Sequence, residues 1–192
     1  MTRLILASSS PYRRELLQRL QLDFESISPE IDESSHENEH PGAYVQRLAI
    51  EKAAKIGRSH PHDLIIGSDQ CSVNGETILG KPKDRDHAIE QLSAASGKQI
   101  EFLTAVSVQH FDSGWHREWV DVFCVNFRPL SLDEIERYLD AEQPYNCAGS
   151  FKSEKLGISL CESMHGDDPT ALIGLPLIRI AQSLREFGLQ VP

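Results

Sequence analysis

The sequence lacks any stretch that could cross a membrane or direct secretion. Apolar runs such as Leu64–Ile66 are a few residues long, far short of the roughly 20 residues that a bilayer-spanning helix needs. The opening residues Met1–Ala7 do not contain the long apolar segment of a signal peptide. We therefore expect a soluble, cytoplasmic protein with no membrane partner.

Cysteine is also scarce, and the cysteines follow no metal or redox spacing. The four are Cys71, Cys124, Cys147 and Cys161, and no two of them form a Cys-x-x-Cys pair. In a chain of 192 residues, scattered cysteines are more typical of free thiols in a reducing cytosol than of a disulfide framework.

Basic residues are outnumbered, because 19 lysines and arginines face 29 aspartates and glutamates and leave a net charge of −10. That balance argues against broad electrostatic binding of DNA or RNA. It does not exclude a small anionic ligand, since a few local cations can dominate one pocket.

What is present is a pattern of alternating short apolar runs and helical stripes. It predicts an α/β fold, with one mixed twisted sheet flanked by helices, in a single domain over residues 1–192 that could form two lobes. The expected strands are 4–7, 22–27, 64–67 (within 63–69), 100–109, 119–127 and 157–161, with a hairpin turn at Asn74-Gly75. One helix is expected to begin at Pro11, and further helices are expected over 43–57, 84–96, 131–140 and 176–187. Residues 29–41 are expected to form a loop.

The first candidate site is the segment Ser8–Arg14, where three serines and a proline separate a strand from a helix. Arg13 and Arg14 are electrostatically unfavourable in a first helical turn, and Arg13 also falls on the apolar stripe. An anion bound by hydroxyls, helix N–H groups and guanidinium groups would resolve both problems. The alternative is a solvated turn whose arginines pair with acids elsewhere.

The second candidate is Lys52, which falls on the buried stripe of the 43–57 helix. A buried ammonium needs a partner, although a lysine at the edge of the stripe could instead extend to solvent. Spacing alone does not decide between these two interpretations.

The third candidate is Asp69, within Gly67–Gln70 directly after a buried strand. Ligands gather at the carboxyl ends of strands in open α/β sheets, and Ser8 also follows a strand. Asp69 could therefore hold a metal or act as a general base. A turn or cap aspartate is the simpler alternative.

Weaker signals complete the set. Lys81 precedes a proline and should be extended, and Asp32-Glu33 could add an oxygen ligand for a divalent cation. Cations of this number with one or two carboxylates suit metal-assisted attack of water on a polyphosphate.

The segment His36–His40 matches the His-Glu-x-x-His zinc pattern in letters only. That pattern requires a helix, and Pro41 disfavours helical geometry at His40. We interpret the segment as a solvated loop.

The ordered set resembles the Maf family of nucleoside triphosphate pyrophosphatases over essentially the whole chain. The segments that carry the resemblance are Leu4–Leu17, Asp32-Glu33, Glu51–Ala53, Gly67–Gln70, Gly80–Pro82 and Ala148–Phe151. The resemblance implies an elongated α/β fold with a deep central groove, similar to that of inosine triphosphate pyrophosphatases. It also implies metal-dependent hydrolysis between the α- and β-phosphates, with Mg²⁺, Mn²⁺ or Co²⁺ as the divalent cation.

The resemblance further implies roles for single residues. Asp69 would be the proton acceptor and, with Glu33, a metal ligand. The phosphate-binding residues would be Ser8, Arg13, Arg14, Lys52 and Lys81.

The resemblance also implies which nucleotide base is selected, through three positions at which the branches of the family differ. Tyr12, Gln70 and Glu154 are similar to the branch that acts on 7-methyl-GTP, whose base is cationic. An aromatic ring can stack on such a base, and a carboxylate can accept hydrogen bonds from guanine. Tyrosine stands where that branch often has tryptophan.

The alternatives are a pyrophosphatase for dTTP, UTP or another modified nucleotide, and a non-catalytic nucleotide-binding regulator of cell division. A homodimer is also possible.

Overall fold

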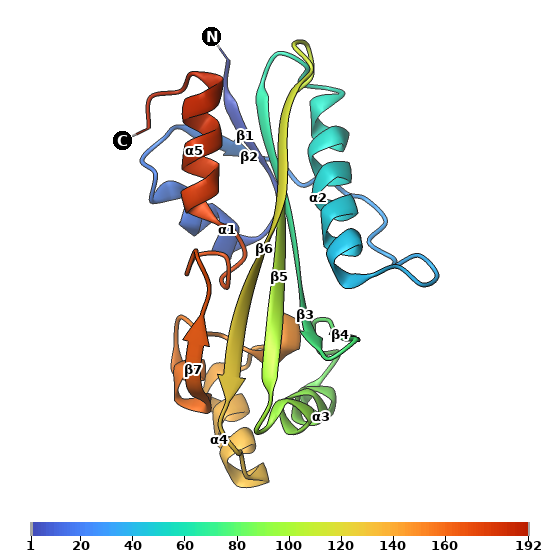
Figure 1. Cartoon of the computed structure of the whole chain (residues 1–192), viewed down its shortest axis with the longest axis vertical. Coiled ribbons are helices and arrows are strands. Elements are labelled where there is room, and N and C mark those ends of the chain that lie inside the picture. The colour runs from blue at the N-terminus through green and yellow to red at the C-terminus, as the bar shows by residue number, and fades with distance from the viewer. Residues whose placement is uncertain (1, 192) are drawn as a thin grey trace.

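The computed structural model describes residues 2–191 and is elongated, with one long sheet running through both ends (Figure 1). In chain order the elements are β1 (Leu4–Ala7), α1 (Pro11–Gln18), β2 (Phe24–Ser26), α2 (Pro41–Gly57), β3 (Leu64–Asn74), β4 (Thr77–Leu79), α3 (Arg85–Ala95), β5 (Gln99–His110), β6 (Trp115–Phe127), α4 (Leu132–Glu142), the short 3-10 helices η1 (Ala148–Ser150) and η2 (Leu156–Leu160), β7 (Cys161–His165) and α5 (Leu177–Phe187).

Helix starts follow from local sequence chemistry. Ser10 caps α1 by accepting a hydrogen bond from the Arg13 backbone N–H, and Pro11 occupies the first helical position. The His40 side chain caps α2. Ser131 and Glu134 form a reciprocal capping box at α4. These caps fix where each helix begins and therefore which side chains reach the middle of the molecule.

Within the described residues, the strands form a seven-stranded mixed sheet in the order β2-β1-β3-β5-β6-β7, with β4 paired to β3 outside that path. β1 pairs in parallel with both β2 and β3, and the remaining pairs are antiparallel. The predicted mixed twisted sheet flanked by helices is therefore confirmed.

The two ends of the sheet are covered differently (Figure 1). At one end α2 lies on one face, while α1 and α5 lie on the other, where Leu17, Ile66 and Ile180 are buried together. At the opposite end α3 and α4 pack on the sheet around Phe123 and Leu139. Between these two cores, a third one with Val45, Cys71 and Ala105 joins α2 to the middle of the sheet.

The edge of β3 is interrupted at this midpoint. β1 pairs with β3 only as far as Gly67, and β4 pairs only from Ser72 onward. Residues 68–71 therefore have a strand neighbour, β5, on one side only. Successive side chains of a strand point to opposite faces, so an interrupted edge lets side chains of both faces reach the same space.

Two sequence predictions of strands were wrong in their bounds. The third strand does not end at Gly67 but runs on to Asn74, because its pairing with β5 continues and Cys71 and Val73 remain buried. The strand predicted at 157–161 is instead η2, with the exposed residues Ile158 and Ser159. Strand β7 begins only at Cys161, where pairing with β6 becomes available.

Candidate active site

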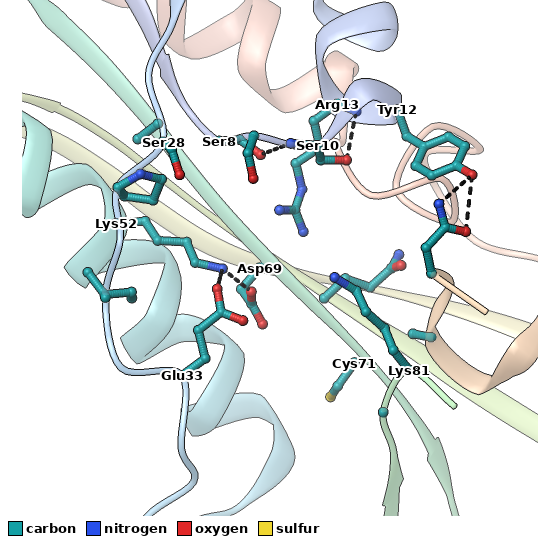
Figure 2. Close-up of a pocket in the computed structure, with 18 of the residues that line it drawn as sticks. Ser8, Ser10, Tyr12, Arg13, Ser28, Glu33, Lys52, Asp69, Cys71 and Lys81 are labelled. Atoms are coloured by element: carbon teal, nitrogen blue, oxygen red, sulfur yellow. Dashed lines mark hydrogen bonds and ion pairs between the residues drawn. The ribbon is translucent and has the colours of Figure 1, made fainter. Parts of the chain in front are cut away.

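A cavity of about 460 Å³ opens at the interrupted edge of β3 (Figure 2). Its walls come from segments far apart in the sequence: the end of β1 with the start of α1, the loop before α2, α2 itself, β3 and the segment after β4. The side chains that matter below are Ser8, Arg13, Glu33, Lys52, Asp69 and Lys81, all of which line it. The predicted convergence of these residues is thus observed.

Lys52 is buried between two carboxylates. Its Nζ lies 2.6 Å from Asp69 Oδ1 and 2.7 Å from Glu33 Oε1. Lys52 is only 5% exposed and Asp69 7%, so the ammonium is paired, as its burial requires. The interpretation of Lys52 as a side chain that extends to solvent is therefore excluded.

The close approach of α2 to β3 brings Lys52 within reach of Asp69. Gly67 makes that approach possible, since a Cβ at this position would lie 2.2 Å from the Ala49 carbonyl oxygen. Asp69 is two residues further along the strand and so points to the same face of the sheet, toward α2. In the Gly67–Gln70 segment, the glycine therefore allows α2 to pack closely on β3, whereas the aspartate lines the cavity.

Helix α2 also holds the loop that carries Glu33. The Tyr44 hydroxyl donates to the Glu33 carbonyl oxygen over 2.9 Å, and Arg47 Nη2 donates to the Ser34 carbonyl oxygen over 3.0 Å. Arg47 Nε additionally lies 2.6 Å from Glu39 Oε1. The loop is therefore fixed at several points, although Glu33 itself remains more than half exposed.

The cations around Glu33 keep it ionised. Partial burial would raise the pKa of Glu33, but the hydrogen bond and charge of Lys52, together with Lys81 and Arg13, lower it overall. Burial raises the pKa of Tyr44, and the charges of Asp69 and Glu33 raise it further. The cavity thus combines anionic carboxylates with cations that face them.

Arg13 enters the cavity from the first turn of α1 (Figure 2). Its Nε donates to the Gly174 carbonyl oxygen over 2.9 Å, and Ser68 Oγ donates to the same oxygen over 3.1 Å. Gly174 adopts a φ of +120°, a conformation that favours glycine. Burial lowers the pKa of Arg13, although the charges of Asp69 and Glu33 counteract this. Ser8 is buried beside it and accepts a hydrogen bond from the Ser10 N–H over 3.1 Å.

Lys81 approaches from the other side, on the segment after β4. The preceding carbonyl oxygen, that of Gly80, accepts from Gly149 N over 3.2 Å and from Gln91 Nε2 over 3.1 Å. These bonds fix the backbone next to Lys81, whose side chain is exposed. Arg13 and Lys81 both line this cavity and the smaller one described next.

A second cavity of about 100 Å³ adjoins the first and shares Tyr12, Arg13, Gln70 and Lys81 with it. Its other walls include the apolar side chains Phe102, Phe151 and Leu172, and the exposed Glu154. The three residues predicted to select a base, Tyr12, Gln70 and Glu154, all line this cavity.

The orientation of the Gln70 amide follows from its partners. Nε2 lies 2.9 Å from the Ala171 carbonyl oxygen, 3.1 Å from that of Leu172 and 2.9 Å from Thr104 Oγ1. Backbone carbonyls only accept hydrogen bonds, so the nitrogen must face them. The amide oxygen of Gln70 is therefore turned away from these carbonyls, and it is a hydrogen-bond acceptor.

Two predicted residues lie elsewhere. Arg14 is exposed and lines neither cavity. Asp32 is also outside both cavities, and its carboxylate accepts from the Ser34 backbone N–H over 2.9 Å. His36 lies in a loop and His40 caps α2, so the two histidines do not share a helix face.

Sequence reasoning missed Tyr44, Cys71 and Asn146, which also line the first cavity. Tyr44 could have been found, because it precedes Lys52 by eight residues and thus lies on the same face of α2. Burial raises the pKa of Cys71 to about 12, so its thiol is unreactive at neutral pH. No local signal in the sequence marks Asn146.

The profile of a family described as "Maf-like protein" matches residues 3–187. The chain is 56% identical over 189 residues to a 7-methyl-GTP pyrophosphatase of Alcanivorax borkumensis, covering 98% of this chain and 96% of that protein. It is 51% identical over 192 residues to a protein of the same name from Pseudomonas putida, covering all of both chains. The family and branch predicted from the sequence are thereby confirmed.

Among solved structures, the chain is similar to a HAM1 protein from Coxiella burnetii, with a TM-score of 0.46 and 14% identity over 66% of this chain and 73% of that one. Within the described residues, none of the helices has the length and apolar character needed to span a bilayer.

Proposed function

Since the chain belongs to the Maf family, we propose that it is a pyrophosphatase that hydrolyses 7-methyl-GTP to 7-methyl-GMP and pyrophosphate. The observation that carries the proposal is the buried Lys52–Asp69 pair in a cavity that Arg13 and Lys81 also line. The names of the relatives support the same substrate. We further propose that the chain forms one domain, because β5 contributes residues to the cores at both ends of the molecule.

In the proposed reaction, water attacks the α-phosphorus while the bond from that phosphorus to the α–β bridging oxygen breaks. Asp69 accepts the proton of the water, and Lys52 orients the carboxylate through the 2.6 Å contact. Arg13 and Lys81 neutralise phosphate oxygens at the junction of the two cavities. The Ser8 hydroxyl would add a hydrogen-bond donor near the same phosphates.

The carboxylates fit a divalent cation. Asp69 and Glu33 face the same ammonium, so a metal near that position would meet two hard oxygen donors. Within residues 2–191, no group of three or more His, Cys, Asp and Glu could hold a metal. Mg²⁺ commonly binds through one or two carboxylates plus substrate phosphates. Such a cation would neutralise charge that develops on the phosphates.

The second cavity would hold the base. The ring of Tyr12 offers a stacking surface for the cationic 7-methylguanine. Glu154 would accept hydrogen bonds from N1–H and the amino group of guanine, and the Gln70 amide oxygen offers a further acceptor. This division assigns the phosphates to the larger cavity and the base to the smaller one.

A panel of nucleotides tests the proposal. Purified protein is incubated with 7-methyl-GTP, GTP, dTTP and UTP in Mg²⁺ or Mn²⁺, and pyrophosphate and monophosphate are measured. We expect the highest kcat/KM for 7-methyl-GTP. Preference for dTTP or UTP would transfer the assignment to another branch of the family, and nucleotide binding without pyrophosphate release would favour a regulator of cell division. Sedimentation of the same sample tests the predicted homodimer.

A further inference from the structure

The ring of Tyr12 already interacts with a cation of the protein. Lys152 Nζ lies 5.5 Å from the centroid of the Tyr12 ring, within the range of a cation–π interaction. Tyr12 lines both cavities, whereas Lys152 lines neither. The lysine therefore contacts the ring from outside the space that a nucleotide would occupy.

The position of Lys152 is set by the surrounding structure. Its backbone N–H donates to the hydroxyl of Tyr138 over 3.1 Å, and Tyr138 is buried in the core formed by α3 and α4. The Tyr12 hydroxyl is fixed as well, at 3.3 Å from Asn146 Oδ1 and 3.2 Å from Asn146 Nδ2. The segment between α4 and η2 thus fixes the Tyr12 hydroxyl and the backbone from which the Lys152 side chain extends to the ring.

The ammonium remains charged in this position. Partial burial acts to lower the pKa of Lys152, but the interaction with Tyr12 and the charges of Cys147 and Glu142 together outweigh it, and the pKa is raised overall. Two residues further along, Glu154 carries the opposite charge and lines the second cavity. A cationic base entering that cavity is attracted by Glu154 and repelled by Lys152, and it shares the Tyr12 ring with the lysine.

We propose that Lys152 is a specificity-determining residue that limits the preference of this site for a positively charged base over a neutral one. The proposal rests on the function proposed above. Because specificity is a difference between two affinities, a fixed positive charge on the stacking ring weakens binding of 7-methylguanine more than binding of guanine. The contact with Lys152 orients the Tyr12 ring, but it lowers the discrimination between 7-methylguanine and guanine.

The test is the variant Lys152→Met, assayed with 7-methyl-GTP and GTP. Removal of the charge should raise the ratio of the two kcat/KM values about two- to fivefold, the range for one exposed cation–π contact. The change should arise from a lower KM for 7-methyl-GTP. Lys152→Arg keeps the charge and should keep the ratio. Lys155→Met removes an equal charge from an exposed neighbour and should also leave the ratio unchanged.

A double-mutant cycle with Tyr12→Leu tests whether the charge of Lys152 acts on the substrate ratio through the Tyr12 ring. Without the ring, Lys152→Met should change the ratio much less than it does in the native background. A ratio that is unchanged or lowered in Lys152→Met, or changed equally in Lys155→Met, would overturn the proposal.

Failure of the proposed function is separable from failure of this inference. If the native protein does not hydrolyse 7-methyl-GTP, calorimetric Kd values for 7-methyl-GMP and GMP replace the kinetic ratio. Native protein and the same variants are compared in that assay. The Kd ratio must shift in the same direction in Lys152→Met, or the inference is wrong.

Discussion

The two cavities of the groove are built in different ways. In the larger one, Lys52 and Asp69 are buried, paired and carried by α2 and β3, which pack tightly against each other. In the smaller one, the lining residue Glu154 is exposed and lies on a segment without long helices or strands, which also carries the neighbouring Lys152 outside the cavity. The comparison indicates that Lys52 and Asp69 are fixed by α2 and β3, whereas Glu154 lies on a connecting segment that can vary without disturbing the core.

The largest expected effect is on Asp69. Asp69→Asn keeps the size of the side chain and a hydrogen-bonding partner for Lys52 but cannot accept a proton. Pyrophosphate release should fall by about 10²- to 10⁴-fold, and equally for 7-methyl-GTP and GTP, because Asp69 is proposed to act on the attacking water and not on the base. Asp23→Asn, at an exposed position, should leave turnover unchanged. A variant at Asp69 that keeps most of its turnover would remove this residue from the role of base.

The second effect concerns stability. Lys52→Met leaves the buried Asp69 without its counter-ion and should lower the free energy of unfolding by about 3 kcal/mol, toward the low end for a broken buried pair. Lys55→Met on the exposed face of the same helix should change it by less than about 0.5 kcal/mol. Urea denaturation measures both. Equal losses in the two variants would contradict the view that the larger cavity is the more rigid one.

A smaller effect is expected at the base-selecting end. Glu154→Gln removes the negative charge that favours a cationic base, so kcat/KM for 7-methyl-GTP should fall about tenfold, within the range for a hydrogen bond to a charged group. GTP turnover should fall less, and stability should not change. Glu162→Gln, also exposed, is the control for net charge. An equal loss with both nucleotides would mean that Glu154 does not distinguish the methylated base.

The smallest effect depends on pH and concerns the loop that carries Glu33. The hydrogen bond from Arg47 lowers the pKa of Glu39 from 4.5 to about 2. The stabilisation by Glu39 is therefore complete above about pH 4.5 and is lost as the pH falls toward 2. The difference in Tm between the native protein and Glu39→Gln should be constant at neutral pH and should close over that interval. Glu37→Gln, in the same loop, should show no such difference.

Much of the larger cavity could be predicted from the sequence, because each of its groups is locally unusual. A lysine on a buried stripe, an arginine on an apolar stripe and an aspartate after a buried strand all require an explanation, and one cavity explains Lys52, Arg13 and Asp69 together. Arg14 is a second arginine in the same helical turn as Arg13, but it points to solvent, since adjacent helical residues are about 100° apart around the axis.

The extent of β3 and the position of β7 could not be read from local pattern. Polar residues after Gly67 resemble the end of a strand, yet the strand continues, because pairing with β5 and burial of Cys71 and Val73 override the local signal. Similarly, the carbonyls of Ala171, Leu172 and Gly174 orient Gln70 and Arg13. Backbone acceptors of this kind carry no side-chain signature.

The gap between β1 and β4 has a consequence for how such a protein can diversify. Because the edge of the sheet is interrupted there, Asp69 and Gln70, which are adjacent and point to opposite faces of β3, both line the larger cavity. The proposed proton acceptor and one proposed base-selecting residue are thus adjacent on one strand, so a backbone change that adapts one also moves the other. New substrate ranges are therefore more accessible through α1 and the chain after α4, where altered residues leave the acid in place.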